Sequence, residues 1–402
     1  MKITLLVFSD FPDGSAMGRR THLLSKGFAE LGHEVSVVVA QRFSNGPLYE
    51  EFDGLKVYWG TLTTPETFHD LSERLKARWA SYKIVCKLFR QGMDWLILIF
   101  PELDRLPYLL VAKKYGVKII SSYEDDRTLP PNPTIRNYFL FLRAKLADKI
   151  IPRLTNLNTV TSTFLDRAIR KTAPKTPTFP FPPIVDPEVF VYNQSAAGSF
   201  RSKWKLGNDV VVAYTGTYWY VEGLANLLAA ANNLSQSGEK FKLVISGKAH
   251  LGLFADNVSE LIGKYHLENV VIETGWLATE EVVAAMSAAD ILVAPKLSHP
   301  ANVAGMPTKL AEYLATGHAL ITTRVGDIPL YLTDSEDSLL CEPGNDNSLT
   351  EKLRILIRDK SNRIKLAANA RNTACKHFDY RSVTKRLESM MIQLQKSNIN
   401  TL

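Results

Sequence analysis

Residues whose types and spacing could hold a charged ligand are concentrated in AGMPTKLAEYLATGHALITT, residues 304–323. Pro307 predicts the start of a helix and Gly317 its end. The first turn of such a helix presents unpaired backbone N–H groups to an anion. Glu312 follows Thr308 by one turn on the same face, where its carboxylate could accept hydrogen bonds from both hydroxyl groups of a ribose. The alternative is a helix on which Glu312 is solvated.

A second candidate is the loop FPDGSAMGRR, in which Gly14 and Gly18 stand between an apolar strand and a helix. Glycines at such a turn let the backbone approach a ligand closely. The spacing is not G-x-G-x-x-G, so the loop does not indicate a dinucleotide site. It is either a ligand-binding loop or a flexible connection, and Arg19 and Arg20 point either at phosphate or at solvent.

Acidic residues gather in SSYEDDR, residues 121–127, which includes Glu124. Paired carboxylates bind Mg²⁺ or Mn²⁺ beside phosphates, so a metal site is one interpretation. Acceptor binding and a solvated loop are the other two, and we expect no metal here.

Two stretches, 72–91 and 135–153, interleave basic and aromatic residues. Basic amphipathic helices can lie on anionic membranes with their aromatic side chains at the headgroups. In the alternative, the aromatic side chains pack in the core of a domain and the Lys and Arg side chains are solvated. Peripheral membrane contact through these stretches would suit a lipid-linked acceptor.

The elements that must position these residues follow from the hydrophobic pattern. Short apolar strands alternate with amphipathic helices, which is typical of parallel sheets covered on both faces. The segment 172–187 holds six prolines, so it cannot be a regular core element and predicts the connector between two doubly wound α/β domains. The predicted strands are 3–8, 35–39, 95–100, 117–121, 157–161, 210–214, 242–246, 270–273, 291–294, 319–322 and 339–341. The predicted helices include 21–31, 103–115, 224–234 and 279–288.

Composition and charge narrow the classes of partner. The chain of 402 residues is 46% hydrophobic, and its net charge of +7 favours anionic partners. Dense basic clusters are lacking, so we expect no nucleic acid, and no apolar run is long enough to predict a membrane-spanning helix. We interpret the first apolar run as a strand rather than a secretory leader. Cys86, Cys341 and Cys375 indicate neither a disulfide framework nor a zinc site, which predicts the reducing cytoplasm.

Several segments resemble, in order, motifs of the group 1 glycosyltransferases (glycosyltransferase family 4). FPPIVDPEVF is similar to I-P-N-G-V-D-x-x-x-F, KFKLVISGKA to L-x-I-V-G, NVVIETGWL to V-x-F-x-G, and MSAADILVAP to A-D-V-x-V-x-P. AGMPTKLAEYLATGHALITT resembles the Glu-x7-Glu motif E-G-F-G-x-x-x-x-E-A-x-A-x-G-x-P-V-I-x-x, and VGDIPLYL resembles V-G-G-x-x-E. The likeness spans nearly the whole chain and is most specific between about 205 and 345.

This resemblance implies an α/β chain with the GT-B fold, in which two doubly wound Rossmann-like domains face a central cleft. It implies an acceptor-binding domain at 1–190, a nucleotide-sugar-binding domain at 191–377 and a C-terminal helix, 378–396, that packs back on the first domain. The implied reaction moves a hexose from a UDP- or GDP-sugar to an acceptor hydroxyl with retention, without a metal or other cofactor. A role in the synthesis of a polysaccharide or of a glycolipid or other glycoconjugate would place the protein in the cytoplasm, peripheral on the inner face of the membrane.

The chain departs from the family pattern where the family holds the donor. The first Glu of the pair falls on Ala304, the phosphate-binding Arg on Thr217 and the Lys on Glu222. The family's histidine after its fourth strand is missing, and Glu124 stands near that position. Residues that could replace the lost positive charges are Lys309, Arg19 and Arg324.

We therefore take Glu124 and Lys309 as the catalytic candidates. The substrate-binding candidates are Gly14, Gly18, Arg19, Gly216, Thr217, Thr274, Gly275, Trp276, Gly305, Met306, Pro307, Thr308 and Glu312. The departures also leave two alternatives to a transferase. One is a non-catalytic GT-B scaffold that binds a nucleotide or a protein partner, and the other is a GT-B sugar-nucleotide epimerase.

Overall fold

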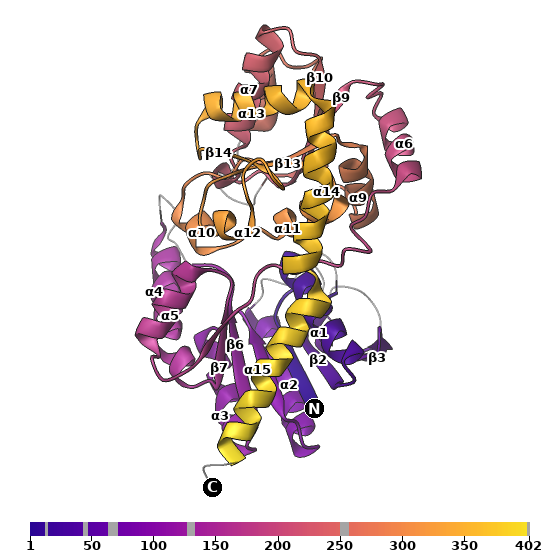
Figure 1. Ribbon diagram of the computed structural model, residues 1–402. Helices are drawn as coiled ribbons and strands as arrows, with labels where there is room; N and C mark the ends of the chain where they lie inside the picture. Colours follow the sequence, from indigo (N-terminus) through magenta and orange to yellow (C-terminus); the bar gives the residue numbers. More distant parts are fainter. Residues whose placement is uncertain (13–14, 43–46, 63–70, 127–132, 250–256, 400–402) are drawn as a thin grey trace. The chain divides into compact units, whose positions relative to one another are not determined.

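The computed structural model describes residues 1–12, 15–42, 47–62, 71–126, 133–249 and 257–399. The chain forms two compact units, one made of Met1–Ile184 with Tyr380–Leu402 and the other of Val185–Asp379. The division therefore follows Ile184 rather than residue 190. Each unit is built on a sheet with helices on both faces, which confirms the predicted α/β class with two doubly wound domains (Figure 1).

In the described part of the first unit, eight strands lie in the order β3-β4-β2-β1-β5-β6-β7-β8, parallel except for β3. The strands are β1 (Lys2–Val7), β2 (Glu34–Arg42), β3 (Tyr49–Phe52), β4 (Leu55–Leu62), β5 (Trp95–Ile99), β6 (Lys118–Tyr123), β7 (Leu157–Val160) and β8 (Thr178–Pro180). The helices are α1 (Ala16–Glu30), α2 (Leu71–Arg90), η1 (Leu103–Arg105), α3 (Leu106–Lys114), α4 (Ile135–Ile150), η2 (Ile151–Arg153), α5 (Thr163–Thr172) and α15 (Tyr380–Ile399).

Successive side chains of β1 point to opposite faces of this sheet, as the pleat requires. Ile3 and Leu5 pack in the cluster that includes residues of α1 and α15, and Leu6 packs with residues of α2 and α3. The C-terminal helix α15 lies against α1 because Gly27 leaves room for it, since an added Cβ there would come within 2.6 Å of Oγ1 of Thr384.

Three strands of the first unit were not predicted. β3 and β4 form a hairpin whose two-residue turn is Asp53–Gly54, both with positive φ, so the Asp-Gly pair was the overlooked sequence signal. β8 lies in the proline-rich connector, where regular structure was excluded. It occupies the edge of the sheet, beside β7 alone, and an edge strand tolerates proline because one side needs no ladder hydrogen bonds.

In the described part of the second unit, six parallel strands lie in the order β11-β10-β9-β12-β13-β14. The strands are β9 (Val210–Thr217), β10 (Phe241–Lys248), β11 (Val271–Gly275), β12 (Ile291–Ala294), β13 (Ala319–Thr323) and β14 (Leu339–Cys341). The helices are α6 (Gln194–Lys203), η3 (Tyr220–Glu222), α7 (Leu224–Gln236), α8 (Val258–Lys264), α9 (Thr279–Ala288), α10 (Pro300–Ala304), α11 (Thr308–Thr316), α12 (Ile328–Tyr331), α13 (Asp346–Arg358) and α14 (Lys360–His377).

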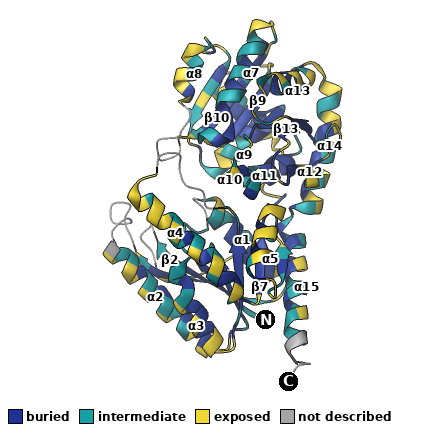
Figure 2. Ribbon diagram, turned by 90° about the vertical axis from the view of Figure 1, so that its left-hand side faces the viewer, coloured by how far each residue is buried: buried dark blue, intermediate teal, exposed yellow. Residues whose placement is uncertain are grey.

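Alternate residues of β9 divide the core of the second unit in the same way. Val211 and Ala213 pack with residues of α9, α11 and α14, and Val212 packs with residues of α7 and α13. Strands β12 and β13 are accordingly buried along their whole length, and the helices that cover the sheet carry exposed residues (Figure 2). The carboxyl ends of these strands are the edge where open parallel sheets bind their ligands.

Candidate functional site

A buried cluster of charges lies at the carboxyl end of β9, between η3 and the first turn of α11. Both oxygens of Glu222 are engaged, Oε1 by the ammonium of Lys296 at 2.7 Å and Oε2 by that of Lys309, also at 2.7 Å. The three side chains are only 8%, 10% and 13% exposed, respectively. We call these three residues the Glu222 cluster. With two ammonium groups on one carboxylate, it carries a net positive charge into a largely desolvated position.

Neutral groups fix the positions of the two lysines. The ammonium of Lys309 donates to the hydroxyl of Tyr214 at 2.9 Å and lies 4.3 Å from the centre of its ring. The ammonium of Lys296 donates to Oδ1 of Asn302 at 3.0 Å, and the Asn302 amide in turn donates to the carbonyls of Val221 and Leu297. Each ammonium group is therefore oriented by hydrogen bonds as well as by charge.

The cluster shifts the proton affinities of its members. Burial alone would raise the pKa of Glu222, but the charges and hydrogen bonds of Lys309 and Lys296 outweigh burial and hold that pKa at about 2. Burial lowers the pKa of Lys309, although Glu222 opposes the change. Burial, followed by the charge of Glu222, raises the pKa of Tyr214 well above its usual value. Near neutral pH Glu222 is thus an anion and Tyr214 a neutral hydroxyl.

Two of the predicted substrate-binding residues, Gly216 and Thr217, end β9 beside this cluster. Gly216 has φ of +143°, and an added Cβ would lie 2.5 Å from the ammonium of Lys309. Thr217 is exposed, and its carbonyl accepts a hydrogen bond of 2.7 Å from the hydroxyl of Tyr214. The structure therefore places the ammonium of the predicted residue Lys309 beside Gly216 at the end of β9.

The predicted helix of 304–323 is α11, which begins at Thr308 after Pro307 and ends at Gly317 in the left-handed conformation. Gly305 and Met306 are buried in the connection from α10. The Tyr313 hydroxyl accepts from the Thr215 amide at 2.7 Å and donates to the Thr215 carbonyl at 3.1 Å, which holds α11 against β9. Glu312 is half-buried in the same helix.

The candidates Thr274, Gly275 and Trp276 lie at the end of the edge strand β11, with β10 between it and β9. The Thr274 hydroxyl donates to that of Ser246 at 2.9 Å, and Gly275 has φ of +73° with open space around its Cα. The Trp276 side chain is 66% exposed. Because β10 separates β11 from β9, these three residues form a separate part of the strand edge from the Glu222 cluster.

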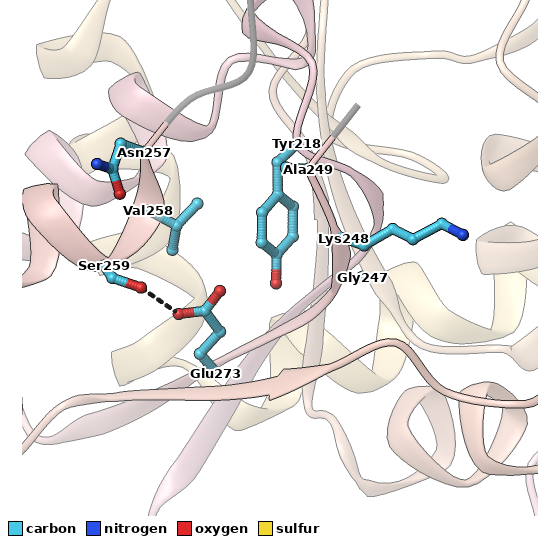
Figure 3. A pocket seen from close by; sticks show the side chains of 8 residues that line it. All are labelled: Tyr218, Gly247, Lys248, Ala249, Asn257, Val258, Ser259 and Glu273. Atoms are coloured by element: carbon cyan, nitrogen blue, oxygen red, sulfur yellow. Dashed lines mark hydrogen bonds between the residues drawn. The ribbon is translucent and has the colours of Figure 1, made fainter. Parts of the chain in front are cut away.

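A hollow of about 360 Å³ also opens at this edge (Figure 3). Its lining residues are Tyr218, Gly247, Lys248, Ala249, Asn257, Val258, Ser259 and Glu273. Ser259 donates to Oε2 of Glu273 at 3.0 Å, and the Tyr218 hydroxyl points into the same hollow. Burial, followed by Glu273, raises the pKa of Tyr218, so this hydroxyl is a donor rather than an anion.

In the first unit, Glu124 directly follows β6 and forms an ion pair with Arg20 of α1. Nε of Arg20 lies 3.1 Å from Oε1 of Glu124, and its guanidinium also donates to the carbonyls of Phe181 and Pro182. The two side chains are 5% and 14% exposed. Burial raises the pKa of Glu124 although Arg20 lowers it, so this carboxylate binds a proton more readily than a solvated one. Arg20 was predicted to point either at phosphate or at solvent. In the structure its guanidinium binds a carboxylate and two carbonyl groups of the protein.

The remaining candidates of the first unit lie in the glycine loop. Gly14 lies outside the described residues. Gly18 is buried in the first turn of α1, where an added Cβ would lie 2.0 Å from the carbonyl oxygen of Asp10, so close packing of its own loop requires this glycine. Arg19 is half-buried beside it. Among the described residues no three His, Cys, Asp or Glu side chains form a group that could hold a metal ion.

Sequence reasoning missed Lys296, Asn302 and Tyr214. Lys296 comes two residues after the apolar strand β12, and a charged residue just beyond the carboxyl end of a buried strand is a usable signal for a site residue. Asn302 and Tyr214 carry no comparable signal, since one lies in a short helix and the other inside a strand.

Comparisons with known proteins show which sequences and folds this chain resembles. Residues 198–373, within the second unit, match the family model described as Glycosyl transferases group 1. A putative colanic acid biosynthesis glycosyltransferase, WcaL of Salmonella typhimurium, is 24% identical over 172 residues, which are 42% of this chain and 42% of that protein. The chain thus spans about two fifths of the length of this curated relative.

Solved structures share the fold. Sucrose-phosphate synthase from Thermosynechococcus elongatus has a TM-score of 0.77 at 17% identity, covering 98% of this chain and 99% of that one. HepE of Anabaena, solved in complex with UDP-glucose, has a TM-score of 0.74 at 17% identity, covering 98% and 100%. The fold is that of GT-B glycosyltransferases, and the family match supports a group 1 glycosyltransferase.

Proposed function

We propose that this chain is a retaining glycosyltransferase that moves a hexose from a UDP- or GDP-sugar to an acceptor hydroxyl, in the synthesis of a polysaccharide or of a glycolipid or other glycoconjugate. The observation that carries the proposal is the position of Lys309, whose ammonium lies at the carboxyl end of β9 within the family-matched region. The glycosyltransferase relative and the UDP-glucose complex of HepE support a nucleotide-sugar donor. The proposed location is the cytoplasm.

In this proposal the second unit binds the donor. Lys309 and the N–H groups of the first turn of α11 bind the diphosphate, with Gly305, Met306, Pro307 and Thr308 shaping that turn. Glu312 binds the ribose, and Thr274, Gly275 and Trp276 lie where the base binds. Glu222 acts as a positioning residue that holds Lys309 beside Gly216 and Thr217 at the end of β9.

The first unit binds the acceptor in this proposal, and Glu124 acts on the reacting hydroxyl. The departing phosphate helps to take the proton of the acceptor. The protein then contributes mainly orientation and stabilisation of the negative charge that develops on the leaving group. Lys309 supplies the positive charge for that stabilisation, and we propose that no metal or other cofactor takes part.

A nucleotide-binding screen tests this assignment. Thermal unfolding of the full chain is measured with UDP, GDP, ADP and their sugars, for the wild type, Glu312→Ala and Glu268→Ala. Glu268 is an exposed acidic residue of the same unit and serves as the matched control. At a ligand concentration about 100 times Kd, binding adds about 2.7 kcal/mol to the stability of the wild type and of the control. Glu312→Ala should lose most of that gain, and equal stabilisation of all three proteins would remove Glu312 from the site.

A non-catalytic scaffold is the second candidate, because Glu222 neutralises part of the charge that would otherwise face a diphosphate. A sugar-nucleotide epimerase is the other enzyme of this fold that the replaced positions allow. Incubation of the bound UDP- or GDP-sugar with and without acceptor separates the three. Acceptor-dependent release of the nucleoside diphosphate indicates a transferase, conversion of the sugar without acceptor an epimerase, and binding without either change a scaffold.

A further inference from the structure

Helix α4 of the first unit turns a row of large apolar side chains toward solvent. The side chains of Ile135, Phe139, Leu142 and Leu146 are 92%, 67%, 49% and 48% exposed. Their spacing of i, i+4, i+7 and i+11 places them on one face of the helix. The buried residues of α4 are the small Ala144 and Ala147, so the helix packs its small residues inward and its large ones outward. A continuous exposed face of this kind marks an interaction surface.

Basic residues flank this row. Arg136 and Lys149 are exposed near the two ends of α4. The neighbouring helix α5, which contacts α4, adds three more exposed basic residues, Arg167, Arg170 and Lys171, of which Arg170 forms an ion pair with Asp166 of the same helix. Two further basic residues of α4 are already paired within the fold, Arg143 with Glu102 and Lys145 with Asp126. The surface therefore combines an apolar row with a positive surround.

Helix α2, the other basic and aromatic stretch, is built differently. Val85, Leu88 and Phe89 are buried in the core cluster, and the helix packs over β2 and β4. Its exposed apolar side chains are Leu75 and Trp79, and the Trp79 ring stacks on that of Tyr82 at 5.9 Å. The core-packing alternative therefore describes α2, whereas α4 is the stretch that presents an apolar face.

We propose that the α4 face, defined as Ile135, Phe139, Leu142 and Leu146 with the basic residues of α4 and α5, docks on an anionic lipid bilayer. An interfacial helix lies in the plane of the membrane with its apolar row below the headgroups and its Lys and Arg side chains among the phosphates. The charge pattern favours lipid, because a second copy of this chain would bring the same positive surround against itself. None of the helices described has the length and apolar character to cross the bilayer, so contact through this face is peripheral. The proposal goes beyond the donor site and does not depend on it.

Vesicle co-sedimentation of the full chain tests this inference. Phosphatidylcholine vesicles with and without phosphatidylglycerol are compared for the wild type, for Phe139→Ser/Leu142→Ser and for Leu110→Ser. Leu110 is a 67% exposed leucine of α3 and is the matched control. All three proteins should keep the same thermal unfolding midpoint, because the substituted side chains are exposed. An Arg136→Gln/Lys149→Gln variant tests the charge contribution separately.

The wild type and Leu110→Ser should bind vesicles that contain phosphatidylglycerol, and bind less as salt rises. Phe139→Ser/Leu142→Ser should weaken binding by about tenfold or more, and Arg136→Gln/Lys149→Gln by about tenfold on anionic vesicles. The inference is overturned if the wild type does not bind these vesicles, or if the folded double serine variant binds as well as Leu110→Ser. Self-association that the double serine variant abolishes, without vesicle binding, would also overturn it in favour of a second copy.

Discussion

Glu222 and Lys309 lie 87 positions apart in the sequence, yet their carboxylate and ammonium groups meet at 2.7 Å at the end of β9. A family lysine is expected at the position of Glu222, so a negative charge stands where a positive one is usual. Lys309 comes to that place from α11, and Lys296 meets the other carboxylate oxygen. Two ammonium groups, one from α11 and one from just beyond β12, thus meet a single carboxylate at this edge of the sheet.

Replacement of Glu222 by Gln should lower the free energy of unfolding by about 3 kcal/mol at neutral pH. The substitution leaves two buried ammonium groups without their anionic partner. Denaturant unfolding followed by circular dichroism measures the change, with the exposed Glu268→Gln as the control, which should stay within about 0.5 kcal/mol of the wild type. A change in Glu222→Gln no larger than in the control would show that water already screens the cluster.

The acid sensitivity of the fold should extend over two adjoining pH ranges. Burial lowers the pKa of His318 from 6.5 to about 4, so the unfolded chain binds this proton first and stability falls between those pH values. The pKa of Glu222 is lowered from 4.5 to about 2, so its stabilising contribution is present above 4.5 and is lost as pH falls toward 2.

The pKa shifts of His318 and Glu222 each change the free energy of unfolding by up to about 3 kcal/mol across their pH ranges. Unfolding free energies measured at intervals from pH 8 to pH 3 in the wild type and in His318→Gln separate the two contributions. The decline between about pH 6.5 and 4 should disappear in His318→Gln, while the decline at lower pH stays. An unchanged profile in the variant would assign the first range to another group.

Substitution of Gly216 by Ala should disturb the candidate site as well as strain the backbone. Its φ of +143° is unfavourable for alanine, and the added Cβ would also displace the ammonium of Lys309. Gly238 has φ of +80° with open space around it, so Gly238→Ala carries the backbone strain alone, about 1 kcal/mol. Gly216→Ala should lose more stability than this control and should weaken UDP binding in the thermal screen. Equal losses and equal UDP binding would show that Lys309 moves aside freely.

Replacement of Glu124 by Gln separates its structural role from its proposed catalytic one. The variant keeps the shape of the side chain but removes the charge that faces Arg20, which should lower stability by about 1–3 kcal/mol. Transferase turnover should fall by about 100-fold or more, with UDP binding unchanged because the proposed donor residues lie in the second unit. Glu102→Gln, which removes the partner of the more exposed Arg143, is the control and should cost less than about 1 kcal/mol. Full turnover in a folded Glu124→Gln variant would restrict Glu124 to holding Arg20.

The sequence alone was sufficient for the two parallel sheets and for most of their elements. Apolar strands such as β5 and β12 are buried on both faces and therefore appear as continuous hydrophobic runs, and Pro307 and Gly317 mark the ends of α11. These signals are local in the chain. The edge strand β8 was missed because its pairing partner, more than its own hydrophobicity, decides its structure, whereas the β3–β4 hairpin has a local signal in Asp53–Gly54 that was overlooked.

Only the tertiary structure decided how the charges are paired. Nothing in the spacing of Glu222, Lys296 and Lys309 along the chain predicts that three charged side chains from η3, the β12 end and α11 meet in one desolvated place. The same holds for Arg20, which Glu124 and two backbone carbonyls bind within the first unit. Periodicity reports which face of an element is buried, whereas ion pairing between distant segments depends on the order of the strands, and that order is a property of the folded sheet.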